Sequence, residues 1–129
     1  MATHTTQMSL HINADSSVSV DMGIPRLSPS DIPFIAEQQS VEYSLELQQN
    51  KTVHFNALSV GNPHAVLVVE DIDKAPVHTL GSEISVHPRF PAQVNVGFMQ
   101  IVTPNHIKLR VYERGCGETQ ACGSGAVAA

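Results

Sequence analysis

The stretch Gly61-Asn62-Pro63-His64-Ala65-Val66-Leu67-Val68-Val69 determines how the chain is organised. Its first three residues are typical of a turn, because glycine and asparagine favour turns and proline has no backbone donor. Residues 65–69 are aliphatic without interruption and are too few for an independent helix, which favours a strand buried on both faces. The sequence therefore predicts a buried strand that begins directly after a loop.

Alternating apolar residues on the N-terminal side predict pairs of antiparallel strands. The alternation over residues 8–22 is interrupted only by a polar turn, so this segment is expected to form a hairpin. Residues 23–34 contain three prolines and are expected to be a connecting loop. Residues 41–47 and 53–60 alternate again around a turn at 49–51, which predicts a second strand pair.

The segment after the buried strand favours a short helix. Asp73 can cap this helix, and Pro76 suits its first turn. Gly81 lowers the helix propensity of the segment. A single apolar stripe along the helix is formed by Val77, Leu80 and Ile84.

A third hairpin is expected over residues 94–111, with its turn at Thr103-Pro104-Asn105-His106. This hairpin delivers Glu113 and Arg114 at the end of a strand. Residues 115–129 then pass from a glycine-rich loop into the first turn of a helix. Together these elements predict an α/β fold of the α+β type, built mainly from antiparallel hairpins with short helices.

Length and charge limit the class of partner. With 129 residues, of which 42% are hydrophobic, the chain is expected to build one modest core. A formal net charge of -5 leaves no basic surface for nucleic acid or an anionic membrane, so a small molecule is the expected partner. No apolar run approaches the roughly 20 residues of a membrane span, and no signal-peptide core is present, so the cytoplasm is the expected location.

The two cysteines are expected to be free thiols. Cys116 and Cys122 lie six positions apart and match neither a disulfide framework nor a zinc motif, and the histidines lack metal-site spacing. No metal is expected. Cys122 precedes Gly123-Ser124-Gly125 at a helix start, where free backbone N–H groups favour a thiolate and can bind a carboxylate. On this pattern alone, an ordinary buried thiol among small residues is the better interpretation.

Other polar residues have structural interpretations of their own. Asn62 can be a turn former, His64 can cap or pack, and Glu113 with Arg114 can be a solvated ion pair of little energetic value. Asn95 differs, because its amide points inward between valines and requires hydrogen-bond partners. A ligand could be one of those partners.

Four strings, in their order and spacing, resemble the diaminopimelate epimerases. They are Gly61-Asn62-Pro63-His64; Arg89-Phe90-Pro91 with Val94-Asn95-Val96-Gly97-Phe98; Arg110-Val111-Tyr112-Glu113-Arg114-Gly115; and Gly117-Glu118-Thr119-Gln120-Ala121-Cys122-Gly123-Ser124-Gly125-Ala126. The likeness is strongest from Val60 onward, whereas the earlier strands are similar only in pattern. The resemblance implies that residues 1–60 are a strand-rich segment from the end of the family's first lobe and the crossover. Residues 61–129 would be the catalytic segment of the second lobe, truncated in its last helix.

The resemblance also implies an isomerase that interconverts LL- and meso-diaminopimelate, in lysine and peptidoglycan-precursor biosynthesis. Two cysteines would act on opposite faces of the α-carbon, with neither pyridoxal phosphate nor a metal. Cys122 resembles the second-half catalytic cysteine, and His64 and Glu113 resemble the residues that adjust thiol acidity. The resemblance assigns substrate binding to Asn62, Asn95, Glu113, Arg114, Gly123 and Ser124, the last two as backbone donors to the α-carboxylate.

The chain departs from the two-cysteine pattern of the family. Residues 1–61 contain no cysteine, and Cys116 matches no catalytic position. The chain alone is therefore expected to be inactive, and its uncovered edges are expected to promote homo-oligomers or other association. Three alternatives stay open: a proline racemase or phenazine-pathway isomerase with the same two-lobed fold, an inactive binding or assembly module, and a generic thiol enzyme with His64 as its base.

Overall fold

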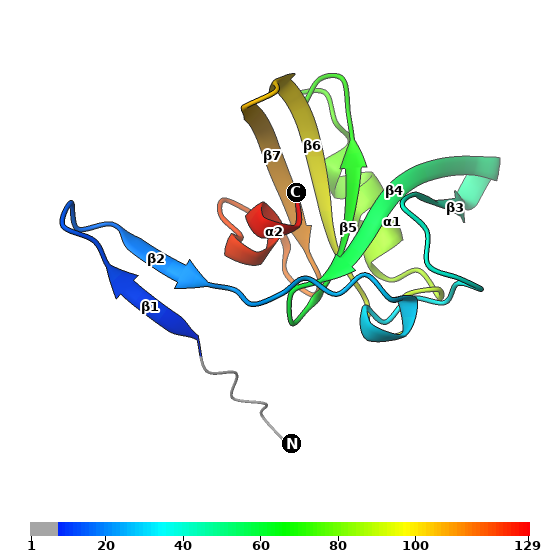
Figure 1. The fold of residues 1–129 in the computed structure, drawn as a ribbon. Helices are drawn as coiled ribbons and strands as arrows, with labels where there is room; N and C mark the ends of the chain where they lie inside the picture. The colour runs from blue at the N-terminus through cyan, green and yellow to red at the C-terminus, as the bar shows by residue number, and fades with distance from the viewer. Residues whose placement is uncertain (1–7) are drawn as a thin grey trace.

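The computed structural model describes residues 8–129 and has the predicted α+β architecture, with two sheets of mainly antiparallel strands and two short helices (Figure 1). A separate hairpin pairs β1 (Ser9–Ile12) with β2 (Val18–Asp21). The main sheet has the order β3-β4-β5-β6-β7-β8. Its strands are β3 (Tyr43–Leu47), β4 (Lys51–Ser59), β5 (Pro63–Val68), β6 (Asn95–Thr103), β7 (His106–Glu113) and β8 (Gly117–Thr119).

The helices lie on opposite faces of the main sheet (Figure 1). Helix α1 (Val77–Ser85) forms the crossover between β5 and β6, which pair in parallel, whereas the other neighbouring strands of the described sheet are antiparallel. Helix α2 (Gly123–Ala128) follows β8. Two short 3-10 turns, η1 (Pro29–Asp31) and η2 (Gln48–Asn50), complete the described elements. No helix within residues 8–129 has the length and apolar character needed to cross a membrane.

The buried strand expected after Gly61-Asn62-Pro63 is confirmed as β5. Ala65, Val66 and Leu67 are buried, and because side chains alternate along a strand, both faces of the sheet are covered here. Burial does not extend over the whole aliphatic run, since Val68 is 58% exposed and Val69 lies beyond the end of β5. The strand starts two residues earlier than the aliphatic run, because Pro63 already pairs with Ser59 across the Gly61 turn. Gly61 adopts a φ of +99° there, a conformation that glycine reaches at little cost.

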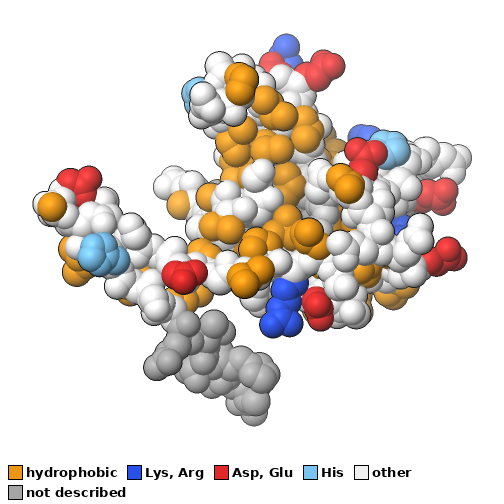
Figure 2. Space-filling model, viewed as in Figure 1, with side chains coloured by type: hydrophobic (Ala, Val, Ile, Leu, Met, Phe, Trp, Pro, Cys, Tyr) orange, Lys and Arg blue, Asp and Glu red, His pale blue; other side chains and the backbone are white. Residues whose placement is uncertain are grey.

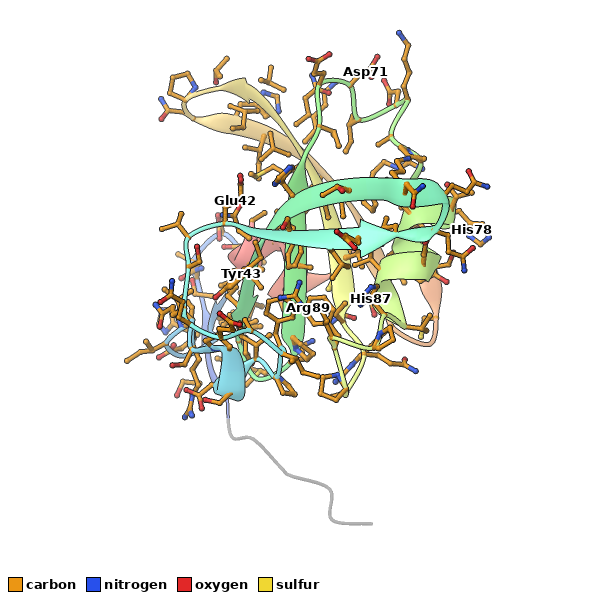
Figure 3. The ribbon with its side chains drawn as sticks, turned by 90° about the vertical axis from the view of Figure 1, so that its right-hand side faces the viewer. Glu42, Tyr43, Asp71, His78, His87 and Arg89 are labelled. Carbon is orange, nitrogen blue, oxygen red and sulfur yellow. The ribbon has the colours of Figure 1, made fainter. Side chains whose placement is uncertain are left out.

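The hydrophobic core lies between the main sheet and α1. The loop at 23–34 adds Ile32 and Phe34 to this core, and the ring of Phe34 contacts three other aromatic rings, those of Tyr43, Phe55 and Phe90. Arg89 links that loop to β3 through hydrogen bonds and a cation–π contact. Its guanidinium lies 4.5 Å above the ring of Phe34 and donates to the carbonyls of Ile35 and Ser44 (Figure 3). The Arg89-Phe90-Pro91 string is thus explained by packing.

Two element boundaries differ from the sequence predictions. The expectation that Asp73 caps the helix is wrong, because α1 begins at Val77 with Pro76 as its N-cap. A proline disfavours helical geometry in the residue before it, so Ala75 cannot continue a helix from Asp73 into Pro76. The strand expected at 41–47 starts at Tyr43, and Val41 is 87% exposed. The sequence also missed β8, whose residues were expected to be loop.

The predicted first hairpin is confirmed, and its apolar residues share one face. Leu10 pairs with Val20, and Ile12 pairs with Val18. These side chains are exposed, at 66% for Leu10 and 75% for Ile12. The hairpin extends away from the main sheet, so the described residues leave this face uncovered (Figure 1).

Gly81 is required where α1 crosses β7. A Cβ atom on Gly81 would lie 2.6 Å from both Cβ and Cγ of Tyr112. Overpacking of this kind costs about 1–3 kcal/mol, which exceeds the helix-propensity gain of about 1 kcal/mol from alanine. We therefore expect Gly81→Ala to lower the free energy of unfolding, measured by urea denaturation.

Thr79→Ala provides the control for this prediction, since Thr79 is exposed on the same helix and the change should move stability by no more than about 0.5 kcal/mol. A Gly81→Ala chain as stable as the parent would contradict the packing argument.

Candidate functional site

The register of the sheet brings several of the predicted residues to one end of one face. His64 pairs with Asn95 across the parallel strands, and Leu58 pairs with His64 on the other side. Because side chains alternate along a strand, Glu113 and Val111 of β7 share this face. Helix α2 lies over the same face and brings Cys122 and Ser124 to it. The face opposite the core therefore carries the candidate site.

Four side chains form one hydrogen-bonded group, the Cys122 cluster, defined as Asn62, His64, Cys122 and Ser124. His64 Nε2 lies 3.1 Å from Asn62 Oδ1 and 3.0 Å from Ser124 Oγ. Asn62 Nδ2 donates to Ser124 Oγ at 3.2 Å, and Ser124 Oγ lies 3.5 Å from Cys122 Sγ. The structure thus joins the turn before β5 to the start of α2, which lie about 60 positions apart.

Cys122 is the N-cap residue of α2, as the sequence predicted for a helix start. Its backbone is extended, with a φ of -141°, and its Sγ accepts a hydrogen bond from the backbone N–H of Gly125 at 3.3 Å. A Cβ on Gly125 would lie 3.2 Å from this sulfur and 3.0 Å from Val111. Glycine at position 125 therefore lets α2 pack closely against the sheet and leaves room for the Cys122 sulfur to contact the first turn of the helix. The Cys122 side chain is half-buried.

Asn95 is 3% exposed, and protein atoms rather than a ligand satisfy its amide. Its Nδ2 donates to the carbonyl of Pro63 at 3.2 Å, and its Oδ1 accepts from the backbone N–H of Arg114 at 2.9 Å. The sequence correctly predicted that the inward amide would need partners. Asn95 holds the backbone at the start of β5 and at the end of β7, and it thereby positions residues on both.

Glu113 and Arg114 do not pair with each other, so the interpretation of a solvated ion pair does not hold. Glu113 Oε1 accepts from Thr119 Oγ1 at 2.9 Å, and Arg114 Nη1 donates to the carbonyl of Ala92 at 2.9 Å. The sequence analysis missed Thr119 because β8, the strand that positions it, has only three residues and shows no clear alternation. Beside it, Glu118 holds β8 to β7 through two hydrogen bonds from Arg110, at 2.6 and 2.9 Å.

Burial determines the charge of His64. The side chain is 1% exposed, and this burial, together with the positive charge of Arg114, lowers the pKa of His64 to about 4, although Glu113 acts in the opposite direction. His64 is consequently neutral at pH 7 and carries a single ring proton.

Two pockets adjoin the cluster. One, of about 540 Å³, lies between the first hairpin and α2, and is lined by Ser9, Asp21, Asn62, Gly123 and Ser124 among others. The second, of about 300 Å³, is lined by Cys122 together with Val111 and Thr119. A further pocket of about 600 Å³, lined by His87 and Glu83 among others, involves none of the predicted site residues. Within residues 8–129, no three His, Cys, Asp or Glu side chains are grouped to hold a metal ion.

Cys116 lies outside the cluster. It is exposed in the turn between β7 and β8, flanked by Gly115 and Gly117, whose φ values are +75° and +90°. Its backbone N–H donates to the carbonyl of Glu113, which closes the turn. Both cysteines are free thiols, as the sequence predicted.

The family model described as diaminopimelate epimerase matches residues 56–129, more than half of the chain. This match includes the Cys122 cluster, Asn95, Glu113 and Arg114. The chain belongs to the diaminopimelate epimerase family. The resemblance stated from the four strings is thereby confirmed.

Individual diaminopimelate epimerases are similar along most or all of the chain. The protein of Legionella pneumophila (strain Corby) is 68% identical over 129 residues, which is 100% of this chain and 47% of that protein. The protein of Pseudomonas aeruginosa (strain UCBPP-PA14) is 55% identical over 120 residues, which is 93% of this chain and 43% of that protein. The chain thus spans about half the length of the curated relatives it matches.

The buried neutral state of His64 predicts a pH dependence of stability. The pKa of His64 is about 4 in the folded chain and near its ordinary value of 6.5 when unfolded, so between these values the unfolded chain binds the extra proton. The free energy of unfolding should therefore fall as the pH drops through this window, by up to about 1.4 kcal/mol per pH unit from this group. Urea denaturation from pH 4 to pH 7 measures the slope.

His64→Gln should remove this contribution to the slope, whereas His54→Gln should retain it, because the His54 side chain is 64% exposed. Equal slopes for the parent and His64→Gln would show that His64 is not held neutral by burial.

Proposed function

We propose that this chain provides one catalytic half of a diaminopimelate epimerase, in which Cys122 exchanges the α-proton on one face of the substrate. The reaction would interconvert LL- and meso-diaminopimelate without a cofactor: one cysteine thiolate would remove the α-proton from one face, and a second cysteine thiol would donate a proton to the carbon from the opposite face. The observation that carries the proposal is the Cys122 cluster, which links the thiol through Ser124 to Asn62 and His64. Asn62 and Ser124 of this cluster line the pocket of about 540 Å³, and Cys122 lines the pocket of about 300 Å³. Residues 61–129 would be the second-lobe segment and residues 1–60 the end of the first lobe, with β4 pairing onto β5 across that boundary and β3 pairing onto β4.

The carboxylate and ammonium groups at the two ends of the substrate would be bound by different residues. We assign the α-carboxylate to the backbone N–H groups of Gly123 and Ser124, which line this pocket beside Asn62. Arg114 would bind the distal carboxylate, since its bond to Ala92 occupies only one of five guanidinium N–H groups. Glu113, whose carboxylate is oriented by Thr119, would contact an ammonium group. Asn95 contributes by holding the backbone of Pro63 and Arg114.

The geometry around the thiol favours this reaction over the alternatives. A generic thiol enzyme would need His64 as a base in contact with Cys122, but His64 Nε2 contacts Asn62 and Ser124. The family match favours diaminopimelate over the substrates of proline racemases and phenazine-pathway isomerases. The substrate class would place the enzyme in lysine and peptidoglycan-precursor biosynthesis, with the cytoplasm as the proposed location.

A second thiol must reach the opposite face of the α-carbon. Cys116 is exposed in the β7–β8 turn and is not part of the Cys122 cluster, so it is not proposed for this role. Each thiol would need to lie roughly 3–3.5 Å from the same carbon, on its own supporting element. The second thiol is therefore proposed to come from a complementary segment, comparable to the rest of the longer relatives.

Exposed apolar faces supply a surface for that association, or for a homo-oligomer. One is the face of the first hairpin formed by Leu10, Ile12, Val18 and Val20. Another lies at the far end of β6 and β7, where Ile101, Val102 and Ile107 are exposed, and Figure 2 shows hydrophobic side chains gathered over these strands. Contiguous apolar surface of this kind commonly marks an interface.

The 129-residue chain alone should not interconvert the two stereoisomers at an enzyme-like rate, because only one face of the α-carbon would meet a catalytic thiol. A separately expressed segment bearing its own cysteine should restore activity when the two pieces assemble. The measurement is α-hydrogen exchange in deuterated solvent with stereochemical analysis of the product.

Cys122→Ala should abolish the restored activity, and the matched control Cys116→Ser should keep it. Robust epimerisation by the isolated chain, or rescue that survives Cys122→Ala, would overturn the proposal.

A further inference from the structure

Ser124 is the most connected member of the Cys122 cluster. Its Oγ lies 3.2 Å from Asn62 Nδ2, 3.0 Å from His64 Nε2 and 3.5 Å from Cys122 Sγ. A hydroxyl has one proton to donate and two lone pairs to accept with. If all three contacts are hydrogen bonds, Ser124 Oγ donates in one of them and accepts in the other two.

The tautomer of His64 follows from its contact with Asn62. Asn62 Oδ1 is an acceptor only, and it lies 3.1 Å from His64 Nε2. Nε2 must therefore carry the ring proton, since two facing lone pairs at this distance would repel. Burial and the nearby Arg114 lower the pKa of His64 to about 4, so the ring keeps this single proton at neutral pH. The N–H of Nε2 is shared between Asn62 Oδ1 and Ser124 Oγ.

The direction of the serine hydroxyl is then determined. Asn62 Nδ2 and His64 Nε2 are both donors to Ser124 Oγ, so they occupy its two lone pairs. The hydroxyl proton is left for Cys122 Sγ, at a distance within the longer reach of sulfur. The Gly125 N–H donates to the same sulfur at 3.3 Å, so two donors converge on it. Donors aimed at an anion stabilise its charged form.

We infer that Ser124 is a positioning residue for the Cys122 thiolate, with its hydroxyl held toward the sulfur by Asn62 and by neutral His64. The inference rests on the proposed function only in taking Cys122 as the reactive thiol. It gives His64 an indirect role, since the imidazole acts on the thiol through the Ser124 hydroxyl. The charged side chains that act on His64 are Glu113 and Arg114, and both stay in place in the variants below.

The test measures alkylation of Cys122 by iodoacetamide against pH, in a Cys116→Ser chain so that one thiol reacts. Ser124→Thr keeps a hydroxyl, and Ser124→Val has nearly the same shape without one. We expect the valine variant to move the midpoint of the pH–rate profile upward by about one unit, so that alkylation at neutral pH slows about tenfold. The threonine variant should keep the parent midpoint.

The midpoint distinguishes the hydrogen bond from a purely structural effect. A change in access to the thiol alters the plateau rate at high pH and leaves the midpoint in place, whereas loss of a donor to the thiolate moves the midpoint. Ser124→Ala repeats the comparison with a smaller side chain, and urea denaturation confirms that each variant is folded.

Coinciding midpoints for the threonine and valine variants, with alanine also at the parent value, would overturn the inference. They would show that the Ser124 hydroxyl does not stabilise the Cys122 thiolate. No substrate is present in this experiment, so it separates the inference from the proposed function. A shifted midpoint without restored epimerisation would contradict only the proposed function.

Discussion

The buried amide of Asn95 connects the two backbone segments that carry most of the site. It donates to the carbonyl of Pro63 and accepts from the N–H of Arg114, so it links the start of β5 to the end of β7. A buried amide without hydrogen-bond partners would cost on the order of several kcal/mol, so moving either backbone segment away from Asn95 would be unfavourable. The parallel pairing of β5 and β6, which α1 makes possible, places Asn95 beside His64 and so sets the position of the Cys122 cluster.

Neutral and charged groups are arranged in different parts of the site. The groups that surround the thiol, Asn62, His64 and Ser124, are polar but uncharged at neutral pH, and they exchange directional hydrogen bonds. The charged residues Glu113 and Arg114 are oriented by separate partners on β8 and in the loop before β6. Such an arrangement can stabilise a thiolate without a cation next to it, while the charged groups remain available to the proposed substrate, which has two carboxylates and two ammonium groups.

Alternation made most of the strands predictable, and the family motifs named residues that the structure brings together. Neither signal predicted the contacts between distant segments. The hairpins and β5 could be predicted because period-two burial is visible locally, whereas three-residue β8 is too short to show it. The start of α1 was misplaced because Pro76 restricts Ala75 more strongly than Asp73 favours a cap. The resemblance named Asn62, His64 and Cys122. The side-chain role of Ser124 depends on partners about 60 positions away, which no local pattern reveals.

Exclusion of water connects the exposed hairpin to the chemistry proposed for Cys122. Removing a weakly acidic α-proton requires a site in which fixed dipoles replace solvent. The pocket beside Gly123 and Ser124 is walled on one side by the hairpin, through Ser9 and Asp21, which pair across its strands. The hairpin presents its apolar residues on the alternate positions, where they are exposed. Covering those residues would hold the hairpin in place, and with it the wall that Ser9 and Asp21 form on one side of the pocket.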